Sequence, residues 1–175
     1  MTVTAEHMRV NQEAQSKRAE FEAAFFQHYT RVYGVLFRLI GDKAEAEDLT
    51  LETFWRLWQQ PPRRADNLGG WLYRVATRLG YNALRAAKRR TRYEDAALRD
   101  AAVSPDPARE AERSDERASV RAALSQMSER DAQLLLLRHS GLSYNDIAAA
   151  LGVSPNSVGT LLTRAEEEFE KLYGE

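Results

Sequence analysis

The 175-residue sequence contains no cysteine, which excludes disulfides, thiolate nucleophiles and zinc–thiolate sites. It also lacks any apolar run of about 18 residues that would cross a bilayer. The polar start, Met1 to Ser16, lacks the basic-then-apolar pattern of a secretory signal. With 43% hydrophobic residues, the chain has enough apolar material to form a core. We therefore expect a folded protein of the cytoplasm with no membrane insertion.

Signals of catalysis are missing as well. The three histidines, His7, His28 and His139, show no His-x-x-x-His spacing, so a metal site is not expected. Gly69-Gly70 is not followed by the Lys-Ser/Thr of a phosphate-binding loop. The sequence therefore predicts no enzymatic activity, no cofactor, no metal and no small-molecule substrate.

A strong net charge is absent too, because 25 Lys and Arg face 26 Asp and Glu, for a net charge of −1. Nucleic-acid-binding domains are usually basic overall, so this total argues against such a partner. The charge is uneven, however: residues 63–92 hold nine basic residues and a single acid, Asp66. The chain is therefore nearly neutral overall but contains one concentrated cationic segment.

The pattern of apolar residues predicts an all-α protein, because period-2 alternation is absent while helical spacing recurs. Residues 93–114 are acidic and poor in large apolar side chains, and Pro105 and Pro107 disfavour a helix there. We expect a flexible leader over residues 1–18, a helical domain over 19–92, a flexible acidic linker over 93–114 and a second helical domain over 115–175.

Three main helices are expected in the first domain. The first carries an apolar face from Phe21 to Leu39, and the second runs from about Ala44 to Gln59. The third begins after Asn67-Leu68-Gly69-Gly70. Its outward face forms what we call the cationic stripe, whose members are spaced three or four residues apart: Trp71, Arg74, Arg78, Tyr81, Arg85 and Arg89.

The cationic stripe has two interpretations. Arginines on a helix usually form a solvated face, but such a face normally includes acids at i+4, and none lies between Asp66 and Glu94. Phosphate would compensate the stacked charge, and the rings of Trp71 and Tyr81 would stack on unpaired bases. The stripe therefore favours nucleic-acid binding. A membrane surface, an acidic protein, or a core position for Trp71 stay open.

The second domain shows the pattern of a helix-turn-helix. Three serines, Ser128, Ser143 and Ser154, stand where N-caps are expected, and Pro155 follows the last of them. Gly152 suits a tight turn, and small Ala148 suits a close helix crossing. A generic helical hairpin is the alternative. The acids that follow the face of the last helix, Glu166, Glu167, Glu168 and Glu170, would repel phosphate.

Three stretches together resemble the extracytoplasmic-function (ECF) sigma factors of bacterial RNA polymerase. They are GDKAEAEDLTLETFWRLW (residues 41–58), GGWLYRVATRLGYNALRAAKRR (residues 69–90) and LSQMSERDAQLLLLRHSGLSYNDIAAALGVSPNSVGTLLTRA (residues 124–165). The resemblance covers nearly the whole chain. It implies a protein that binds core RNA polymerase, recognises minus-ten and minus-thirty-five promoter elements, holds the melted non-template strand and initiates transcription of a stress or signal regulon.

By this resemblance, the second helix docks on the largest polymerase subunit. The implied core-binding residues are Glu47, Asp48, Glu52, Phe54 and Arg56. A solvated Asp48–Arg56 pair and a buried Phe54 are the alternatives.

The resemblance further implies that residues 61–70 capture a flipped base and that the following helix holds the opened strand. The implied minus-ten residues are Arg63, Arg64, Asn67, Trp71, Arg74, Arg78, Tyr81, Asn82, Arg85, Lys88 and Arg89. The implied minus-thirty-five residues are Asn156, Ser157, Gly159, Thr160, Thr163 and Arg164. Arg78, Asn82, Leu51 and Gly159 depart from the residues common in the family at their positions.

Family members are often held inactive by an anti-sigma factor, which is the further partner implied here and would hold the protein at the membrane. The acidic linker is expected either to mimic RNA in the polymerase or to act as a plain tether. A different class of protein stays open as the alternative: a free-standing helix-turn-helix regulator that binds duplex DNA as a dimer without polymerase.

Overall fold

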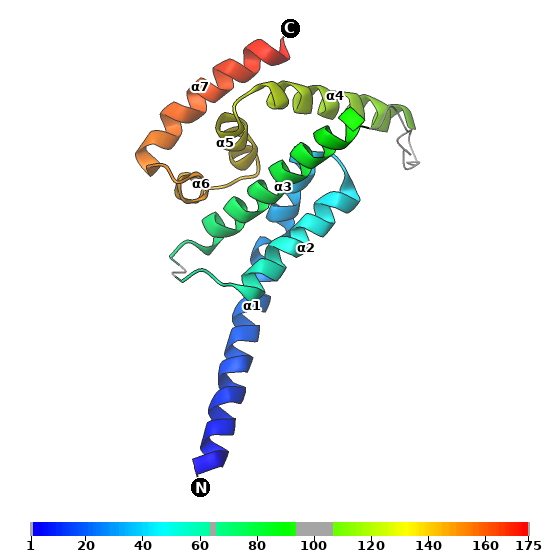
Figure 1. Ribbon diagram of the computed structural model, residues 1–175. Helices are drawn as coiled ribbons and strands as arrows, with labels where there is room; N and C mark the ends of the chain where they lie inside the picture. Colours follow the sequence, from blue (N-terminus) through cyan, green and yellow to red (C-terminus); the bar gives the residue numbers. More distant parts are fainter. Residues whose placement is uncertain (1, 64–65, 94–106, 175) are drawn as a thin grey trace.

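The computed structural model describes residues 2–63, 66–93 and 107–174, with side chains over residues 11–63, 66–90 and 114–174. Over these ranges the protein is all-α and contains seven helices, which confirms the predicted fold class. The first three helices form one bundle and the last four form a second (Figure 1).

The first bundle comprises α1 (Thr2–Ile40), α2 (Lys43–Gln59) and α3 (Leu68–Tyr93). The N-terminal part of α1 extends away from both bundles (Figure 1). Residues 2–18, expected to form a flexible leader, belong to the helix α1. Their sequence supports helical pairs at i and i+4: Ser16 donates to Glu20 over 3.0 Å, and Arg18 pairs with Glu22 at 2.8 Å.

An aromatic cluster holds α1 against α2. The ring of Phe54 is almost fully buried and lies 4.8 Å from that of Phe25 and 6.5 Å from that of Phe21. The turn between the helices is closed by Gly41, at φ 84°, and by the side chain of Asp42, which accepts from the Glu45 amide at 2.8 Å. The predicted start of the second helix near Ala44 is thus confirmed.

The second bundle comprises α4 (Pro107–Gln126), α5 (Glu129–His139), α6 (Tyr144–Leu151) and α7 (Pro155–Tyr173). Most of the predicted linker, residues 94–106, lies outside the described residues. Within the last part of the range predicted as linker, α4 already begins at Pro107. Proline is tolerated in the first turn of a helix, where its missing N–H has no partner to lose.

The helix-turn-helix is formed by α6 and α7. The hydroxyls of Ser128 and Ser143 accept from backbone amides three residues on, at 3.2 Å each, and cap α5 and α6 as predicted. Gly152 ends α6 at φ 70°, in the left-handed region. Ser154 stands at the start of α7 without a side-chain capping bond, so its predicted capping role was wrong in that respect.

The two bundles pack against each other, chiefly through α3 and α6, with smaller contacts from α1 to α4 and α5. Their buried residues form one continuous apolar cluster. The close approach of α3 to α6 depends on Gly70, because a Cβ built there would lie 2.5 Å from the Cβ of Ala149. The helix-turn-helix therefore lies directly on the helix that carries the cationic stripe.

Candidate nucleic-acid interface

The cationic stripe lies on one face of α3, as its spacing predicts. The guanidinium-bearing side chains of Arg74, Arg78, Arg85 and Arg89 are exposed, whereas Trp71 and Tyr81 are half-buried. Trp71 packs against the apolar core while keeping part of its ring at the surface. The structure therefore brings the six residues together on a single surface.

In the loop before α3, the Asn67 side chain makes two hydrogen bonds, and in one of them its Nδ2 donates to the Asn145 carbonyl of α6 at 3.5 Å. The Asn67 side chain accepts a hydrogen bond from the Gly70 amide at 2.6 Å and so satisfies an N–H at the start of α3. Arg63 is exposed, while Arg64 lies outside the described residues. Further along α3, Asn82 accepts from Arg85 at 3.0 Å, and Lys88 is exposed.

The second bundle supplies partners to this stripe. Arg85 forms a bidentate ion pair with Glu129, in which Nε donates to Oε1 at 3.0 Å and Nη2 donates to Oε2 at 2.7 Å. The hydrogen bond and charge of Glu129 raise the pKa of Arg85. Nε of Arg74 donates to the carbonyl of Ala150 at 3.0 Å, and the same guanidinium donates to the carbonyl of Ala149. Two stripe cations thus have acceptors within the chain.

Tyr81 lies under the start of α5. Burial, with a smaller contribution from the charge of Glu129, raises the pKa of Tyr81, so the phenol stays protonated at neutral pH. Its hydroxyl donates to the Glu129 carbonyl at 3.5 Å, a long and weak bond. The aromatic part of the stripe is therefore partly covered in this conformation.

The outer face of α2 holds four of the five residues implied for polymerase binding. Glu47 and Asp48 are exposed, and Arg56 pairs with Glu52 at 2.8 Å. Both side chains of that pair remain more than 40% exposed, so it contributes little to stability and stays available to a partner. Phe54 does not belong to this surface: it is 1% exposed and lies in the core.

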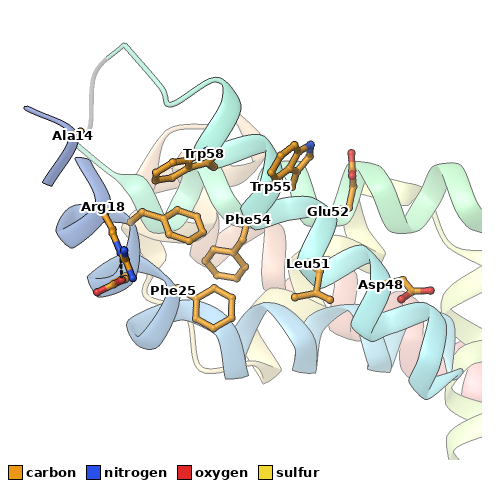
Figure 2. Close-up of a pocket in the computed structure, with 11 residues that line it drawn as sticks. Ala14, Arg18, Phe25, Asp48, Leu51, Glu52, Phe54, Trp55 and Trp58 are labelled. Carbon is orange, nitrogen blue, oxygen red and sulfur yellow. Dashed lines mark hydrogen bonds and ion pairs between the residues drawn. The ribbon is translucent and has the colours of Figure 1, made fainter. Parts of the chain in front are cut away.

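An apolar groove of about 930 Å³ runs beside this face, between α1 and α2 (Figure 2). Leu51 and Trp55 are both about half exposed at its edge, one helical turn apart, and Asp48 lies at the end of the same row. We define the docking row as Asp48, Leu51, Glu52 and Trp55. In the sequence, Leu51 was noted as a departure from the family pattern but Trp55 was not included, although their i and i+4 spacing places both on one face of the helix.

The outward face of α7 is open. Asn156, Ser157, Thr160, Thr163 and Arg164 are exposed, while the helix packs on α4, α5 and α6 through Val158, Leu162 and Ala165. Gly159 is half-buried and has room for a side chain, because an added Cβ would meet only the Tyr144 ring at 3.7 Å. The six residues predicted for duplex recognition therefore share one surface.

Two negative findings concern the described part of the chain. No group of three or more His, Asp or Glu there has the arrangement of a metal site. No helix among these residues is long and apolar enough to cross a membrane.

Comparison with known families divides the chain in the same way as the fold. The Sigma-70 region 2 family matches residues 25–90, and the Sigma-70 region 4 family matches residues 117–169. These two matches correspond to the first bundle and to most of the second.

Individual proteins agree with these matches. The ECF RNA polymerase sigma factor SigE of Mycolicibacterium smegmatis is 36% identical over 150 residues, which cover 82% of this chain and 57% of the relative. The RNA polymerase sigma factor CarQ of Myxococcus xanthus is 31% identical over 161 residues, which cover 89% of this chain and 90% of that protein. This chain thus spans little more than half the length of the first curated relatives it matches.

Solved structures share the fold. CnrH, solved with the cytosolic domain of CnrY, aligns with a TM-score of 0.65 at 18% identity and covers 92% of this chain and 94% of its own. The sigma factor RpoE of Bartonella quintana, solved with the anti-sigma factor NepR, aligns with a TM-score of 0.60 at 21% identity and covers 89% and 97%. Regions 2 and 4 in one all-α chain define the class of RNA polymerase sigma factors, and this chain belongs to the ECF subfamily of that class.

Proposed function

We propose that the protein binds core RNA polymerase, recognises minus-ten and minus-thirty-five promoter elements and initiates transcription of a stress or signal regulon in the bacterial cytoplasm. The observation that carries this proposal is the presence, on one chain, of three separate surfaces suited to three tasks. These surfaces are the docking row on α2, the cationic stripe on α3 and the open face of α7.

The docking row and its neighbours suit a helical protein partner. Leu51 and Trp55 offer apolar area, while Asp48, Glu52 and Arg56 surround it with charges of both signs. Protein interfaces combine an apolar centre with a polar rim in this way. We assign polymerase binding to Glu47, Asp48, Glu52 and Arg56 and give Phe54 the structural role of supporting the helix from beneath.

The cationic stripe suits the melted strand. A protein that opens DNA without nucleotide hydrolysis must bind the single strand better than the duplex, because unstacking costs a few kcal/mol per base. Arginines spaced along α3 would follow the phosphates, and Trp71 and Tyr81 would offer ring surfaces to bases. We include Arg63, Arg64, Asn67, Asn82, Lys88 and Arg89 in this minus-ten surface.

The face of α7 suits duplex DNA. Asn156 and Ser157 lie near the helix N-terminus, where the helix dipole favours phosphate. Thr160, Thr163 and Arg164 follow on the same surface with Gly159 between them, and only one of these residues carries a positive charge. We therefore assign minus-thirty-five recognition to this face and expect weak duplex binding by the second bundle alone.

An anti-sigma factor is the regulatory partner we propose, by analogy with the two solved relatives, each of which was solved with an anti-sigma factor or with a domain of a second protein. Such a partner would hold the protein at the membrane if it were itself anchored there. The surfaces available to it include the docking row and its groove.

The test of the polymerase assignment is Asp48→Arg. Asp48 is exposed, so the change leaves the fold intact while reversing one charge in the docking row. We expect the variant to lose association with core enzyme in gel filtration and to lose promoter-dependent transcription. The matched control is Asp115→Arg, an exposed acid on α4 outside these surfaces, which should behave as wild type. Normal transcription by Asp48→Arg would contradict the assignment, and a dimer that footprints duplex DNA without polymerase would favour a free-standing regulator.

A further inference from the structure

The apolar groove beside the docking row has a second wall, which comes from α1. One wall is α2, which carries Leu51 and Trp55. The other wall is the N-terminal part of α1, and we define the α1 wall as Ala14, Arg18 and Glu22 (Figures 1 and 2). The match to Sigma-70 region 2 begins at residue 25, so all three positions precede it. The groove therefore joins a helix inside the matched region to residues that lie before it.

Trp58 of α2 holds this part of α1 in place. The Trp58 ring meets the ring of Phe21 edge-on, with 5.3 Å between the ring centres. Nζ of Lys17 lies over the same ring, 4.8 Å from its centre. Edge-on ring pairs and cation–π contacts are both favourable beyond the area that they bury. The α1 wall is thus fixed against the C-terminal end of α2, and the groove exists in the free chain.

Exposed apolar side chains gather at this groove. Leu51 and Trp55 are about half exposed on the α2 side. On the α1 side, Phe26 is 82% exposed, and its ring lies 6.0 Å from that of Phe25, which lines the groove. Neighbouring apolar groups left at a surface mark a site that a partner covers.

The shape of the groove fits one α-helix. Its walls are two helices, and its deepest lining residue is Phe54, which is 1% exposed. Asp48 and Trp55 are seven positions apart on α2. That separation corresponds to about 10 Å, or roughly two turns of a helix laid along the groove. Amphipathic helices bind in such grooves through apolar side chains at i, i+3 or i+4, and i+7.

Charges at the rim select the flanks of the bound helix. Glu22 stands on the α1 side, and Asp48 and Glu52 stand on the α2 side. Among the described residues that line the groove, Arg18 is the single cation, and it pairs with Glu22 at 2.8 Å. The rim is therefore acidic on both sides and favours basic side chains next to the apolar stripe of the partner.

We propose that the α1 wall is a second contact surface for core RNA polymerase, and that the groove takes an amphipathic polymerase helix whose apolar stripe is flanked by Lys or Arg. This inference rests on the proposed function, because it assumes that α2 docks on polymerase. A helix bound against Leu51 and Trp55 meets Ala14 on its other side, since all three line one groove. The residues before the family match thus add contact area and charge selection that α2 alone does not provide.

The test changes the α1 wall and leaves the docking row intact. Ala14→Arg and Glu22→Arg place positive charge against the basic flanks of the partner. Their controls are Ala23→Arg and Glu13→Arg, which make the same changes at positions of α1 that do not line the groove. All four positions are exposed, so the helical circular dichroism signal and the Tm of each variant should match wild type.

Binding of each full-length chain to purified core RNA polymerase is measured by biolayer interferometry. We expect the Kd to rise about tenfold for each groove variant, because like charges brought together at an interface weaken it strongly. Each control should change the Kd by less than about twofold, because its charge stays in solvent.

A photocrosslinker identifies what occupies the groove. Because the native chain has no cysteine, Ala14→Cys and its control Ala23→Cys each give a single position for a benzophenone maleimide. With core enzyme present, we expect position 14 to crosslink to a polymerase helix that has an apolar stripe and flanking basic residues. Position 23 should not crosslink to that helix.

Three results would overturn the inference. One is an equal Kd for the groove variants and their controls. Another is crosslinking of position 14 to a second copy of this chain, and the third is crosslinking to an anti-sigma factor but never to polymerase. The proposed function fails separately if the wild-type chain has no affinity for core enzyme. A chain that binds core enzyme and loses it with Asp48→Arg, but not with Ala14→Arg or Glu22→Arg, contradicts the inference alone.

Discussion

The two helices proposed to contact DNA differ in charge and in cover. On α3, the exposed face is densely cationic, and part of it is bound to the second bundle. On α7, the face is polar with one cation, Arg164, and it lies open to solvent. The difference matches two tasks. Holding a single strand relies on charge and stacking that any sequence satisfies, whereas reading a duplex relies on a few hydrogen-bonding side chains.

Among the described residues, the cationic face of α3 has acceptors from the second bundle. A row of like charges is costly to leave uncompensated, and acceptors from the same chain reduce that repulsion. The face of α7 carries a single cation, Arg164. The densely cationic face is therefore the one that is partly covered by the second bundle, and the face with one cation stays exposed.

The largest effect should follow loss of charge from α3. For Arg74→Ala combined with Arg85→Ala, we expect promoter opening to fall on the order of 100-fold, because each charged hydrogen bond contributes about 1.5 kcal/mol. The slope of opening against the logarithm of salt concentration should also become less steep, by the amount expected for the loss of about two phosphate contacts. Fluorescence of a base analogue in the minus-ten element, measured across salt concentrations, checks both. Arg130→Ala, a cation on α5 outside the stripe, is the control, and unchanged opening would remove the stripe's role.

A smaller effect should follow loss of the single cation on α7. We expect Arg164→Ala to weaken use of promoters that depend on the minus-thirty-five element by roughly tenfold, since such a contact contributes about 1 to 2 kcal/mol. Transcription from templates with and without that element measures it. Lys171→Ala, a cation near the end of the same helix, should have no effect. An intact requirement for the element in Arg164→Ala would place recognition on other residues.

Adding charge to the open face should make the two helices more alike. Gly159→Lys fits the available space and adds one cation beside Thr160. We expect affinity for duplex DNA to rise about three- to fivefold. Its dependence on salt concentration should steepen by the amount expected for about one added phosphate contact. The control is Gly159→Ala, which raises helix propensity as the lysine does but adds no charge. Equal affinities for the lysine and alanine variants would show that the face does not lie near phosphate.

The smallest effect concerns how the two helices of the helix-turn-helix begin. Ser143→Ala removes a side-chain cap from α6 and should lower the free energy of unfolding by about 1 kcal/mol, or the Tm by about 2 to 4 °C. Ser154→Ala removes no such bond from α7 and should change stability by less than about 0.5 kcal/mol. Thermal unfolding followed by circular dichroism compares them, and equal losses would show that both serines cap.

Local signals in the sequence predicted most of the fold. Spacing of apolar residues, the serine caps of α5 and α6, and the turn glycine Gly152 lead directly to the observed helices. Pro107 was misread because proline disfavours a helix interior but suits a first turn, and spacing does not distinguish the two positions. The helix over residues 2–18 was not predicted because that stretch has few apolar residues, so periodicity gives no signal there.

The residues of the cationic stripe could be predicted from the sequence, but their contacts with the second bundle could not. Helical spacing places the members of the cationic stripe on one face of α3. For Phe54, the family resemblance implied contact with polymerase, whereas the structure buries this residue in the core. The contact of Arg85 with Glu129 joins residues 44 positions apart, and that of Arg74 with Ala150 joins residues 76 apart. Such pairings depend on how the bundles meet, which no local pattern encodes.

The most direct measurement of the central claim is transcription in vitro by core polymerase, with and without this protein, on a library of genomic fragments from the organism that encodes it. Start sites are read by sequencing. The account predicts a small set of new start sites that appear only with the protein, share two upstream elements at minus ten and minus thirty-five, and disappear with Asp48→Arg. Start sites that do not depend on the protein, or that persist with Asp48→Arg, would contradict it.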